Sequence, residues 1–454
     1  MSAPGLSYRP ADWSDGFRRA RKYAGYGVVR TIPPTQTIRR VLPLMQTVGV
    51  TRIADITGLD SIGIPNFTTV RPRDPGEGIS YYNGKGVTRA AAKAGALMEA
   101  IERYSGELCD HRVYCRTREE MSRSGPTVDP AEILVPTLAA YQPDQALEWV
   151  EGFDLISGTV TFVPLNLVIC PYQPAPGRPR IFCESTNGLA SGNTREEALC
   201  HALCEVIERD AIAVAAASRD LGPAVGRILT QLGVSPPAAP DAAPARDAAP
   251  ARGHPLIDLD TLPPRALALA AKLRRAGLRV YLRDVTSTAG VPVLTCSIVE
   301  PQADGQHIAH GGSGCHPDAR VAVARALTEA AQSRVGHIQG GREDLPAIAA
   351  APRRFDPERV FGGGGLLPFS SIASCQHECV DDDIRLLLAR LAADGFAQVV
   401  AIDLTRPEVG VPVVRVVIPS AEAWSVYYTH IQRTRLGARA VRALTETAHG
   451  RTSP

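Results

Sequence analysis

The stretch Ala92–Glu102 reads AKAGALMEAIE, and the same pattern returns as ALCHALCEVIE at Ala198–Glu208 and as AVARALTEAAQ at Ala322–Gln332. The copies share Ala-x-x-x-Ala-Leu-x-Glu-x-x-Glu/Gln. Residues three and four positions apart lie on one face of a helix, so each copy would present two oxygen-bearing side chains as a unit. Three such helices could place five carboxylates and one carboxamide around a single cleft.

A glycine-rich turn precedes each copy: Asn83–Gly86, Asn187–Asn193 and Gly311–Gly314. Glycines let backbone N–H groups approach an anion, and the dipole of the following helix favours negative charge. Lys85 stands where it could reach a phosphate, and Thr194 with Glu197 predicts a capping box. Carboxylates alone would repel a polyphosphate, so we expect Mg²⁺ between the two. The pattern predicts a metal–nucleotide site.

A simpler interpretation makes each Glu-x-x-Glu-Arg an ordinary salt-bridged helix face, with Glu99 paired to Arg103 and Glu205 to Arg209. A solvated face needs no fixed register against the apolar residues, yet all three copies keep one. The site is also not a familiar one, because the sequence has no P-loop, no G-x-G-x-x-G after a strand and no kinase motif.

Composition sets broad limits on the protein. The chain has 454 residues, of which 44% are hydrophobic and 21% charged, which allows one large core or two. A net charge of +2 offers no argument for binding nucleic acid or an anionic membrane. Ten scattered cysteines suit a reduced, cytoplasmic chain, and no apolar run predicts a signal peptide or a membrane span.

A second repeat predicts the fold. Asp-x-Thr followed by Gly-x-Pro occurs at Asp55–Pro65, Asp284–Pro292 and Asp403–Pro412. In the last two copies a helical segment ends at a glycine, a β-branched strand leads into the Asp-x-Thr turn, and a second strand follows. These helix–strand–turn–strand modules predict an α/β (α+β) fold with helices packed on sheets.

The segments outside the modules divide the chain as follows. We expect a basic N-terminal arm over residues 1–35, which either docks a partner or is solvated, and one main domain over residues 36–425. Within that domain we expect a Pro/Ala-rich mobile insertion at 235–253 and a Gly-rich loop at 342–367. A C-terminal helix with a disordered tail should follow at 426–454.

These motifs together resemble the YcaO family. In the first copy the resemblance rests on GKG at Gly84–Gly86 with ExxER at Glu99–Arg103. In the second it rests on STNGLASGNT at Ser185–Thr194 with ExxERD at Glu205–Asp210, and in the third on GCHP at Gly314–Pro317 with ALTEAAQSR at Ala326–Arg334. The likeness spans about residues 36–420.

The resemblance implies a YcaO-like fold and an enzyme that uses ATP and Mg²⁺ to activate a peptide backbone amide. A nucleophile adds to the amide carbonyl, ATP phosphorylates the oxygen, and loss of phosphate leaves an azoline, a thioamide or an amidine. The residues that resemble metal ligands are Glu99, Glu102, Glu205, Glu208 and Glu329. Those that resemble nucleotide-binding groups are Lys85, Ser185, Asn187, His201, Arg209, Gln332 and Arg334. The chain departs from the family at Gly95, where serine is usual, and at His201, the equivalent place in the second copy.

The resemblance also bears on the nucleophile and partners. The Pro-x-Pro-x-Pro ending of azoline-forming members is missing, and Asp55–Pro65 resembles stand-alone members that work with a TfuA-type protein. We therefore expect thioamide formation with sulfide on a ribosomally made peptide or protein, a TfuA-like partner and a homodimer. An azoline- or amidine-forming cyclodehydratase and a non-catalytic peptide-binding scaffold remain as alternatives.

Other candidate chemistry is less well supported by the sequence. His310 and His316 flank the third glycine-rich turn and could transfer protons. Cys200-His201-x-x-Cys204 and Cys375-x-His377-x-Cys379 could ligate zinc, but neither has C-x-x-C spacing, which favours core packing. The sequence identifies no general base.

Overall fold

The structure, a computed structural model, describes residues 13–23, 29–74, 79–135, 137–231, 254–341 and 352–423, with the side chains of 217–231 excepted. The expected Pro/Ala-rich insertion and C-terminal helix lie outside these residues, as does much of the expected N-terminal arm. Among the described residues, no helix is both long and apolar enough to cross a membrane.

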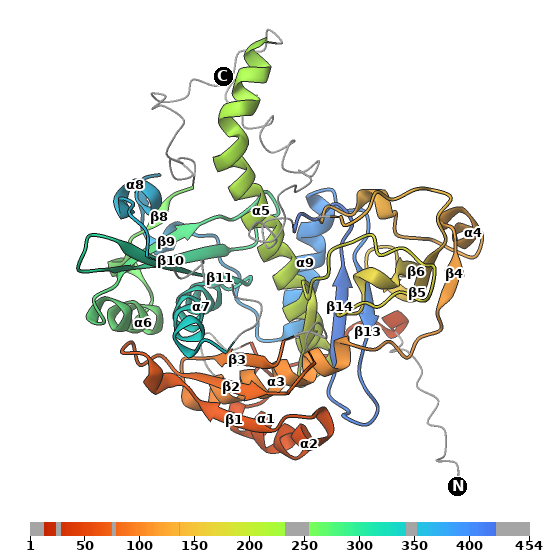
Figure 1. Ribbon diagram of the computed structural model, residues 1–454, viewed down its shortest axis with the longest axis horizontal. Helices are drawn as coiled ribbons and strands as arrows, with labels where there is room; N and C mark the ends of the chain where they lie inside the picture. The colour runs from red at the N-terminus through yellow and green to blue at the C-terminus, as the bar shows by residue number, and fades with distance from the viewer. Residues whose placement is uncertain are drawn as a thin grey trace.

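Three units of related construction make up the molecule (Figure 1). Each contains an amphipathic helical segment, three antiparallel strands and one acidic helix. In the first unit these are α1 (Pro34–Val41) and α2 (Met45–Val48), β1 (Arg52–Asp55), β2 (Asn66–Val70), β3 (Tyr81–Lys85) and α3 (Arg89–Gly106). In the second they are α6 (Pro264–Arg275), β9 (Arg279–Asp284), β10 (Val293–Pro301), β11 (His307–Cys315) and α7 (Ala319–Gln339).

The third unit is assembled from two distant parts of the chain. Its helix α9 (Val380–Ala393) and strands β13 (Val400–Asp403) and β14 (Val413–Val417) come last, whereas β7 (Leu189–Ser191) and α5 (Arg195–Gln231) come much earlier. β14 pairs antiparallel with β7, as β10 pairs with β11 and β2 with β3. The acidic helix α5, second in chain order, therefore joins a sheet that the chain completes only near its end.

The Asp-x-Thr turns explain why the modules repeat. In each, the Asp side chain accepts the backbone N–H of the Thr two residues later, at 2.9–3.0 Å, in an Asx turn. The Thr hydroxyl then accepts the first N–H of the next strand, at 3.0–3.2 Å. The predicted helix–strand–turn–strand module is confirmed in all three units, where it joins β1 to β2, β9 to β10 and β13 to β14.

The Ala-x-x-x-Ala positions of the acidic helices pack directly on glycines of the preceding strand. A Cβ on Gly84 would lie 2.0 Å from the backbone N of Ala96, and one on Gly314 would lie 2.1 Å from the backbone O of Ala322. We predicted that these glycines open the backbone to an anion. The structure gives Gly84 and Gly314 a packing reason instead, because only glycine permits so close a contact between strand and helix.

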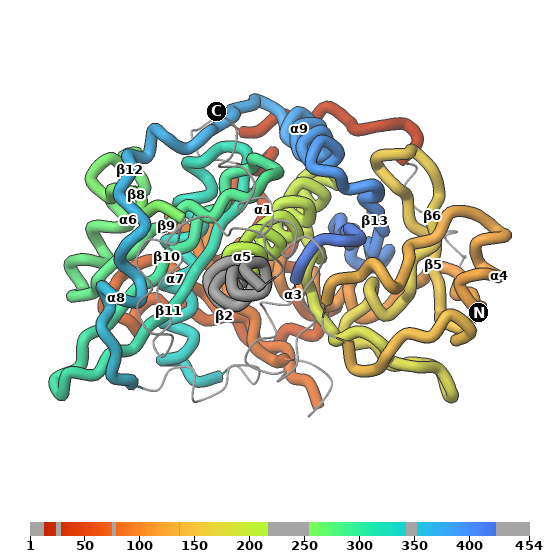
Figure 2. The backbone as a smooth tube through the Cα atoms, turned by 90° about the horizontal axis from the view of Figure 1, so that it is seen from above, coloured from red at the N-terminus to blue at the C-terminus, as the bar shows by residue number. Residues whose placement is uncertain are grey.

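The described strands form three sheets. β1, β2 and β3 form one sheet, and β11, β10, β9, β8 (Leu256–Ile257) and β12 (Leu366–Leu367) form a second in that order. The third runs β4 (Tyr114–Arg116), β5 (Leu147–Asp154), β13, β14 and β7, with β6 (Thr159–Pro164) paired to β5. α4 (Arg118–Ser122) follows β4. Figure 2 shows α5 end-on between the second and third sheets.

Both faces of the third sheet are buried, which fixes the position of α5. Val400 and Ile402 of β13 belong to the apolar core beneath α1, α2 and α3, whereas Ala401 belongs to the core shared with α5 and α9. This alternation is that of a strand with a core on each side. A third core lies between the second sheet and helices α6 and α7.

Two local expectations differ from the structure. The described part of the expected Gly-rich loop 342–367 contains α8 (Pro357–Phe361) and β12. β12 pairs parallel with β8 at the edge of the sheet through backbone hydrogen bonds, although the side chains of Leu366 and Leu367 are exposed. Thr194 accepts the N–H of Glu197, as the capping box predicts, but the Glu197 carboxylate accepts the N–H of Asn193 rather than that of Thr194.

Candidate functional site

The acidic helices meet in a cycle of contacts between units. At the second acidic position of the pattern, each side chain contacts a strand of the neighbouring unit. Glu102 of α3 accepts the N–H of Ser191 in β7 at 2.9 Å. Glu208 of α5 accepts the hydroxyl of Ser313 in β11 at 2.6 Å, and Gln332 of α7 donates to the carbonyl of Asn83 in β3. The three helices thus converge on one region.

Glu102 lies at a strongly acidic point of this region. Burial raises its pKa to about 8, with Arg103 opposing the shift and the carboxylates of Glu99 and Glu205 adding to it. Carboxylates from α3 and α5 therefore act on each other although more than 100 residues separate them in sequence. Excess negative charge of this kind favours a bound cation.

Ser313 links the second and third acidic helices. Its Oγ lies 2.6 Å from Oε1 of Glu208 and 3.2 Å from Oε1 of Glu329. One hydroxyl has one hydrogen, so it can fully satisfy only one of the two carboxylates. Glu208 is 3% exposed, and its negative charge is thus held inside the protein close to that of Glu329.

Basic side chains border the carboxylates on one side. Lys85 forms an ion pair with Glu329. Although burial raises the pKa of Glu329, Lys85 and Arg209 outweigh it and hold that pKa well below its usual range. Arg325 of α7 donates to Nε2 of His201 at 2.9 Å. The cluster therefore has one end near Glu102, where crowded carboxylates disfavour further negative charge, and a charge-compensated end near Glu329.

Two of the five predicted metal ligands also form the salt bridges of the simpler interpretation. Glu99 lies 3.5 Å from Arg103 and Glu205 lies 4.0 Å from Arg209, both at i,i+4. These pairs are not on a solvated face, because the side chains of Glu99 and Glu205 are only 25% and 22% exposed.

Arg334 has protein partners of its own. It forms ion pairs with Asp60 and, at 3.1 Å, with Glu300. His310 stacks near His337, with ring centroids 5.0 Å apart, and burial lowers the pKa of His310 to about 4. Both histidines lie beside Arg334, which was predicted to face phosphate, and no contact joins this group to Glu102 or Glu208 among the described residues.

Ser185 and Asn187 line a separate pocket beside the cluster. We call it the Arg415 pocket, and it is bounded by Ile133, Val135, Asn166, Leu167, Cys183, Ser185, Asn187, Val206, Arg415–Ile418, Ala421 and Ala423. Arg415 donates to the carbonyl of Ser185 at 2.9 Å. Val206 directly follows Glu205, so the pocket adjoins the acidic helix α5.

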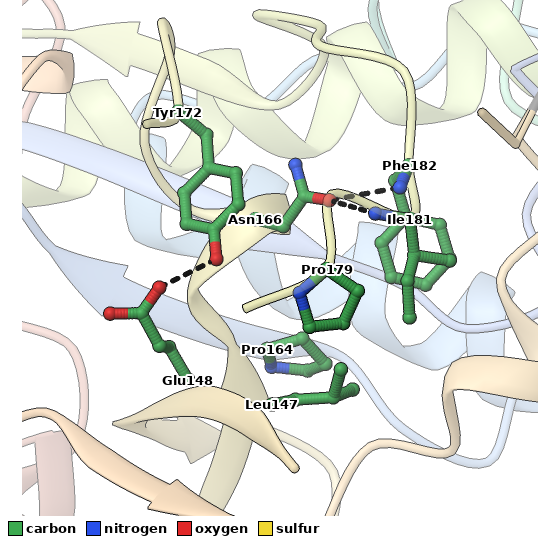
Figure 3. Close-up of a pocket in the computed structure, with 8 residues that line it drawn as sticks. All are labelled: Leu147, Glu148, Pro164, Asn166, Tyr172, Pro179, Ile181 and Phe182. Carbon is green, nitrogen blue, oxygen red and sulfur yellow. Dashed lines mark hydrogen bonds between the residues drawn. The ribbon is translucent and has the colours of Figure 1, made fainter. Parts of the chain in front are cut away.

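A further pocket, lined by Glu148, Tyr172, Pro179 and their neighbours, contains none of the predicted site residues (Figure 3). Tyr172 donates its hydroxyl to Glu148 at 2.7 Å across this pocket.

The cysteine and histidine motifs do not form a convincing zinc site. Potential ligand atoms of Cys200, His316 and Asp383 lie within 4.8 Å of one another. However, Nδ1 of His316 accepts the N–H of Asp318, which places the proton of a neutral ring on Nε2. Asp383 already lies 2.6 Å from Lys22 and 2.9 Å from His377. The cluster is better described as a buried carboxylate surrounded by donors.

Sequence reasoning missed Ser191, Ser313 and Arg325. A signal for Ser191 was present, because it stands seven residues before Ala198, as Lys85 stands seven before Ala92. The pairing registers confirm the equivalence, since Lys85 and Ser191 each pair with the first residue of the neighbouring strand. Ser313 and Arg325 carry no such signal, because their importance depends on contacts between units.

The residues present suit Mg²⁺ and a nucleotide. Mg²⁺ prefers carboxylate oxygens and shares its shell with phosphate. Glu102 and Glu208 supply such oxygens from two helices, while Lys85 and Arg209 supply positive charge at the other end. The donor set matches the predicted metal–nucleotide site in chemistry.

Comparisons with known proteins give the family. The model described as "YcaO cyclodehydratase, ATP- and Mg²⁺-binding" matches residues 83–422. An uncharacterized protein of Methanothermobacter thermautotrophicus is 34% identical over 87% of this chain and 96% of its own length. An uncharacterized protein from the tfuA 3′ region of Rhizobium leguminosarum bv. trifolii is 32% identical over 91% of this chain and 93% of its own length.

Solved structures share the fold. YcaO from Methanopyrus kandleri, bound with AMPPCP and Mg²⁺, has a TM-score of 0.65 at 24% identity and covers 92% of this chain and all of its own. A heterocyclase in complex with substrate and cofactor has a TM-score of 0.68 at 19% identity, over 92% of this chain and 57% of that one. At the level of the family, the predicted cofactors ATP and Mg²⁺ are confirmed. The repeated modules, the converging acidic helices and the family match agree, and the chain belongs to the YcaO family.

Proposed function

We propose that the chain activates a peptide backbone amide with ATP and replaces the carbonyl oxygen by sulfur. Hydrosulfide adds to the amide carbon, the carbonyl oxygen takes the γ-phosphoryl group of ATP, and ADP leaves. Expulsion of phosphate, which carries away the original oxygen, restores the double bond as a thioamide. The observation that carries the ATP-dependent step is the convergence of Glu102, Glu208 and Glu329 from three helices beside Lys85.

In this proposal the acidic residues of the site would hold Mg²⁺ and the basic residues would contact the phosphates of ATP. Glu99, Glu102, Glu205, Glu208 and Glu329 are the groups that would hold Mg²⁺. Mg²⁺, when bound, neutralises negative charge on the phosphates and polarises the transferred group. Lys85 and Arg209 would contact phosphate oxygens directly, and Gln332 would position β3 through the Asn83 carbonyl.

The position of Lys85 suits such a role. Its ammonium is bound by Glu329 and its side chain is 22% exposed, so a phosphate could approach it without a large change of fold. His201, hydrogen-bonded to Arg325, would stay neutral beside the phosphates, because burial lowers its pKa well below the usual range. A neutral imidazole adds no positive charge that would compete with Mg²⁺.

Sulfide as the nucleophile rests on two supports. Asp55–Pro65 resembles stand-alone members of the family that work with TfuA-type proteins. In addition, the Rhizobium relative, which this chain matches over 93% of the relative's length, is described by its place in a tfuA 3′ region. On these grounds we propose a TfuA-like partner, a precursor peptide or protein as substrate, a homodimer, a cytoplasmic location and one catalytic domain over residues 36–425.

A direct assay tests this function. The full chain is incubated with ATP, Mg²⁺, sulfide and candidate precursor peptides, with and without a TfuA-like protein, and the peptides are analysed by mass spectrometry. Exchange of oxygen for sulfur, dependent on ATP, is the expected result. Loss of water without sulfur gain would instead identify a cyclodehydratase, the activity in the family's description.

A second assay separates an enzyme from a scaffold. Calorimetry of ATP binding with and without Mg²⁺ is compared between the wild type, Glu99→Ala and Glu205→Ala. Mg²⁺-dependent binding that both variants weaken supports the catalytic site. Peptide binding by a chain that binds no nucleotide would support the scaffold.

A further inference from the structure

Strand β11 is the end strand of the second sheet, and one of its two edges is open. β11 pairs with β10 on one side, and among the described strands no other pairs with it. The stretch predicted as a glycine-rich turn, Gly311–Gly314, is part of this strand. An edge strand leaves alternate backbone N–H and C=O groups free to pair with another extended chain.

Hydrogen bonds at the two ends of β11 show which residues face the open edge. The backbone N–H of His316 donates to Pro292 at 3.2 Å, on the side of β10. His307 exchanges two backbone hydrogen bonds with Arg353 at 2.8 and 2.9 Å, on the other side. Because the direction alternates along a strand, the outward residues are the odd-numbered ones. Beyond His307 these are Ala309, Gly311 and Ser313.

The outward backbone groups of these three residues are available for pairing. Within the described parts of the chain, no backbone hydrogen bond reaches them from the open side. Arg353 shows how the edge is used, because its reciprocal bonds with His307 form an antiparallel pair. The chain's own backbone therefore occupies one end of the edge and leaves three residues for a further extended segment.

The edge lacks the features by which proteins usually protect such strands. Exposed edges commonly carry charged side chains or proline, whereas β11 reads HIAHGGSGC. Gly311 is exposed, and a Cβ there would meet no atom within 4 Å. A Cβ on Gly312 or Gly314 would instead collide with the backbone of α7. Packing thus explains why Gly312 and Gly314 lack side chains, but it does not explain Gly311.

The open edge leads into the carboxylate cluster. Ser313 is 5% exposed, and its hydroxyl lies 2.6 Å from Glu208 and 3.2 Å from Glu329. Glu329 is also the ion-pair partner of Lys85. A strand rises about 3.3–3.4 Å per residue, so Gly311 and Ser313 lie roughly 7 Å apart along β11. A chain that pairs with exposed Gly311 therefore extends to the groups assigned to Mg²⁺ and phosphate.

We propose that the substrate peptide binds in an extended conformation as an additional antiparallel strand on the open edge of β11, at Ala309, Gly311 and Ser313. Hydrogen bonds to these backbone groups would hold the peptide and bring one of its amides to the carboxylate cluster. The amides of the peptide that face away from β11 would stay unpaired. This inference rests on the proposed function for the meaning of the substrate, and it makes the peptide backbone the recognised feature.

A short peptide and two N-methylated versions test the proposal on the full chain without ATP. Ligand-observed NMR measures binding of acetyl-Thr-Val-Thr-Val-Thr-amide, of the version methylated on the valine amides and of the version methylated on the threonine amides. One version should lose affinity at least ~10-fold and the other should stay within about threefold of the parent, because only alternate N–H groups face one strand edge. Loss in both versions, or in neither, would overturn the proposal.

Gly311→Pro removes one outward N–H and leaves the pairing with β10 intact. Proline is tolerated on an edge strand where its nitrogen faces outward. We expect affinity for the unmethylated peptide to fall at least ~10-fold, while ATP binding remains that of the wild type. Circular dichroism confirms that the variant is folded.

Val160→Pro is the matched control on another sheet. Val160 is 50% exposed on β6, which pairs with β5. Phe162, two residues later, donates its N–H to Pro126 on the side away from β5, so the N–H of Val160 also faces outward. Peptide binding should not change in this variant.

Two results for Gly311→Pro contradict the proposal. Unchanged peptide affinity in the folded variant would show that the edge does not hold the peptide. A change in oligomeric state, measured by light scattering, would show that the edge pairs with a second copy of the chain.

The proposed function can fail separately. Normal Mg²⁺-dependent ATP binding with no peptide binding overturns only the edge site. Peptide binding that depends on Gly311, in a chain that binds no ATP, supports the edge as a peptide-binding site and overturns the proposed ATP-dependent chemistry.

Discussion

Glu102 and Glu329 belong to the same repeated helix pattern, yet their surroundings shift their pKa values in opposite directions. Around Glu102, burial and the charges of Glu99 and Glu205 raise the pKa to about 8 despite Arg103. Around Glu329, Lys85 and Arg209 overcome burial and lower it. The difference teaches which end of the cluster requires an added cation. The end at Glu102 gains from Mg²⁺, whereas the end at Glu329 already has its counter-charge and is suited to meet phosphate.

The largest effect is expected from Glu208→Gln. This change keeps an acceptor for Ser313 but removes the charge of a carboxylate that is 3% exposed. We expect Mg²⁺-dependent ATP turnover to fall by a factor on the order of 10³, the scale of losing one electrostatic contact to the transition state. Steady-state kinetics over a range of Mg²⁺ concentrations measure it.

Glu119→Gln is the matched control, because Glu119 forms an exposed i,i+4 pair with Arg123 on α4 at 2.8 Å. We expect no change in turnover and a stability change within about 0.5 kcal/mol. Wild-type Mg²⁺ dependence in Glu208→Gln would remove Glu208 from the site.

The second prediction concerns pH. The folded pKa of Glu102, about 8, exceeds the ordinary 4.5, so between these values the folded chain keeps a proton that the unfolded chain has lost. Stability without Mg²⁺ should therefore decrease as pH rises through this window. Urea unfolding in the presence of a chelator measures the slope, which should be flatter in Glu102→Gln.

Saturating Mg²⁺ should also flatten the slope of the wild type, because a bound cation replaces the proton on Glu102. A slope that is the same in wild type and Glu102→Gln would show that Glu102 ionises normally. The contrast with Glu329 would then disappear.

Lys85→Met tests the compensated end of the cluster. Loss of the ammonium removes the nearest positive charge from Glu329, and its pKa should rise toward that of Glu102, as NMR titration can follow. Nucleotide affinity should fall roughly 10- to 100-fold, the cost of one charge-assisted contact to phosphate.

Lys93→Met on α3 serves as control for Lys85→Met. Lys93 is a lysine of the same unit outside the contacts of the cluster, and nucleotide affinity should not change. If both variants weaken ATP binding equally, the effect reflects net charge rather than the position of Lys85.

The smallest effect on ATP binding is expected at Arg334, where a variant distinguishes a structural role from a phosphate-binding role. Arg334→Gln breaks the ion pairs with Asp60 and Glu300 and should lower the free energy of unfolding by about 2 kcal/mol. ATP affinity measured by calorimetry should stay within about twofold of wild type. A large loss of ATP affinity without a loss of stability would instead support Arg334 as a phosphate-facing group.

The fold could be predicted from the sequence where local chemistry repeats. The Asp-x-Thr turns at Asp55, Asp284 and Asp403 bond within a few residues, so their spacing alone indicated the modules. The third unit could not be predicted, because β7 and β14 pair across more than 200 residues and nothing local records that pairing.

The candidate site was predicted in outline for a similar reason. The register of the acidic helices identified Glu102 and Glu208, which the structure brings into one cluster. The sequence did not identify Ser313, which contacts Glu208, because that contact depends on how α5 crosses β11. Nor did it show that Arg334 has Asp60 and Glu300 as partners, since these three residues come from different parts of the chain.

The close packing of Gly84 and Gly314 on the acidic helices has a consequence for ion selection. With no side chain between each strand and the acidic helix of its own unit, the distance from Lys85 or Ser313 to the carboxylates of that same helix cannot widen by repacking of side chains. Mg²⁺ binds oxygen ligands at about 2.0–2.1 Å, whereas Ca²⁺ binds a larger number of oxygen ligands at about 2.3–2.6 Å. A site whose backbone cannot expand discriminates between cations by ionic radius. Gly84 and Gly314, which contact no ligand themselves, would therefore help to exclude Ca²⁺.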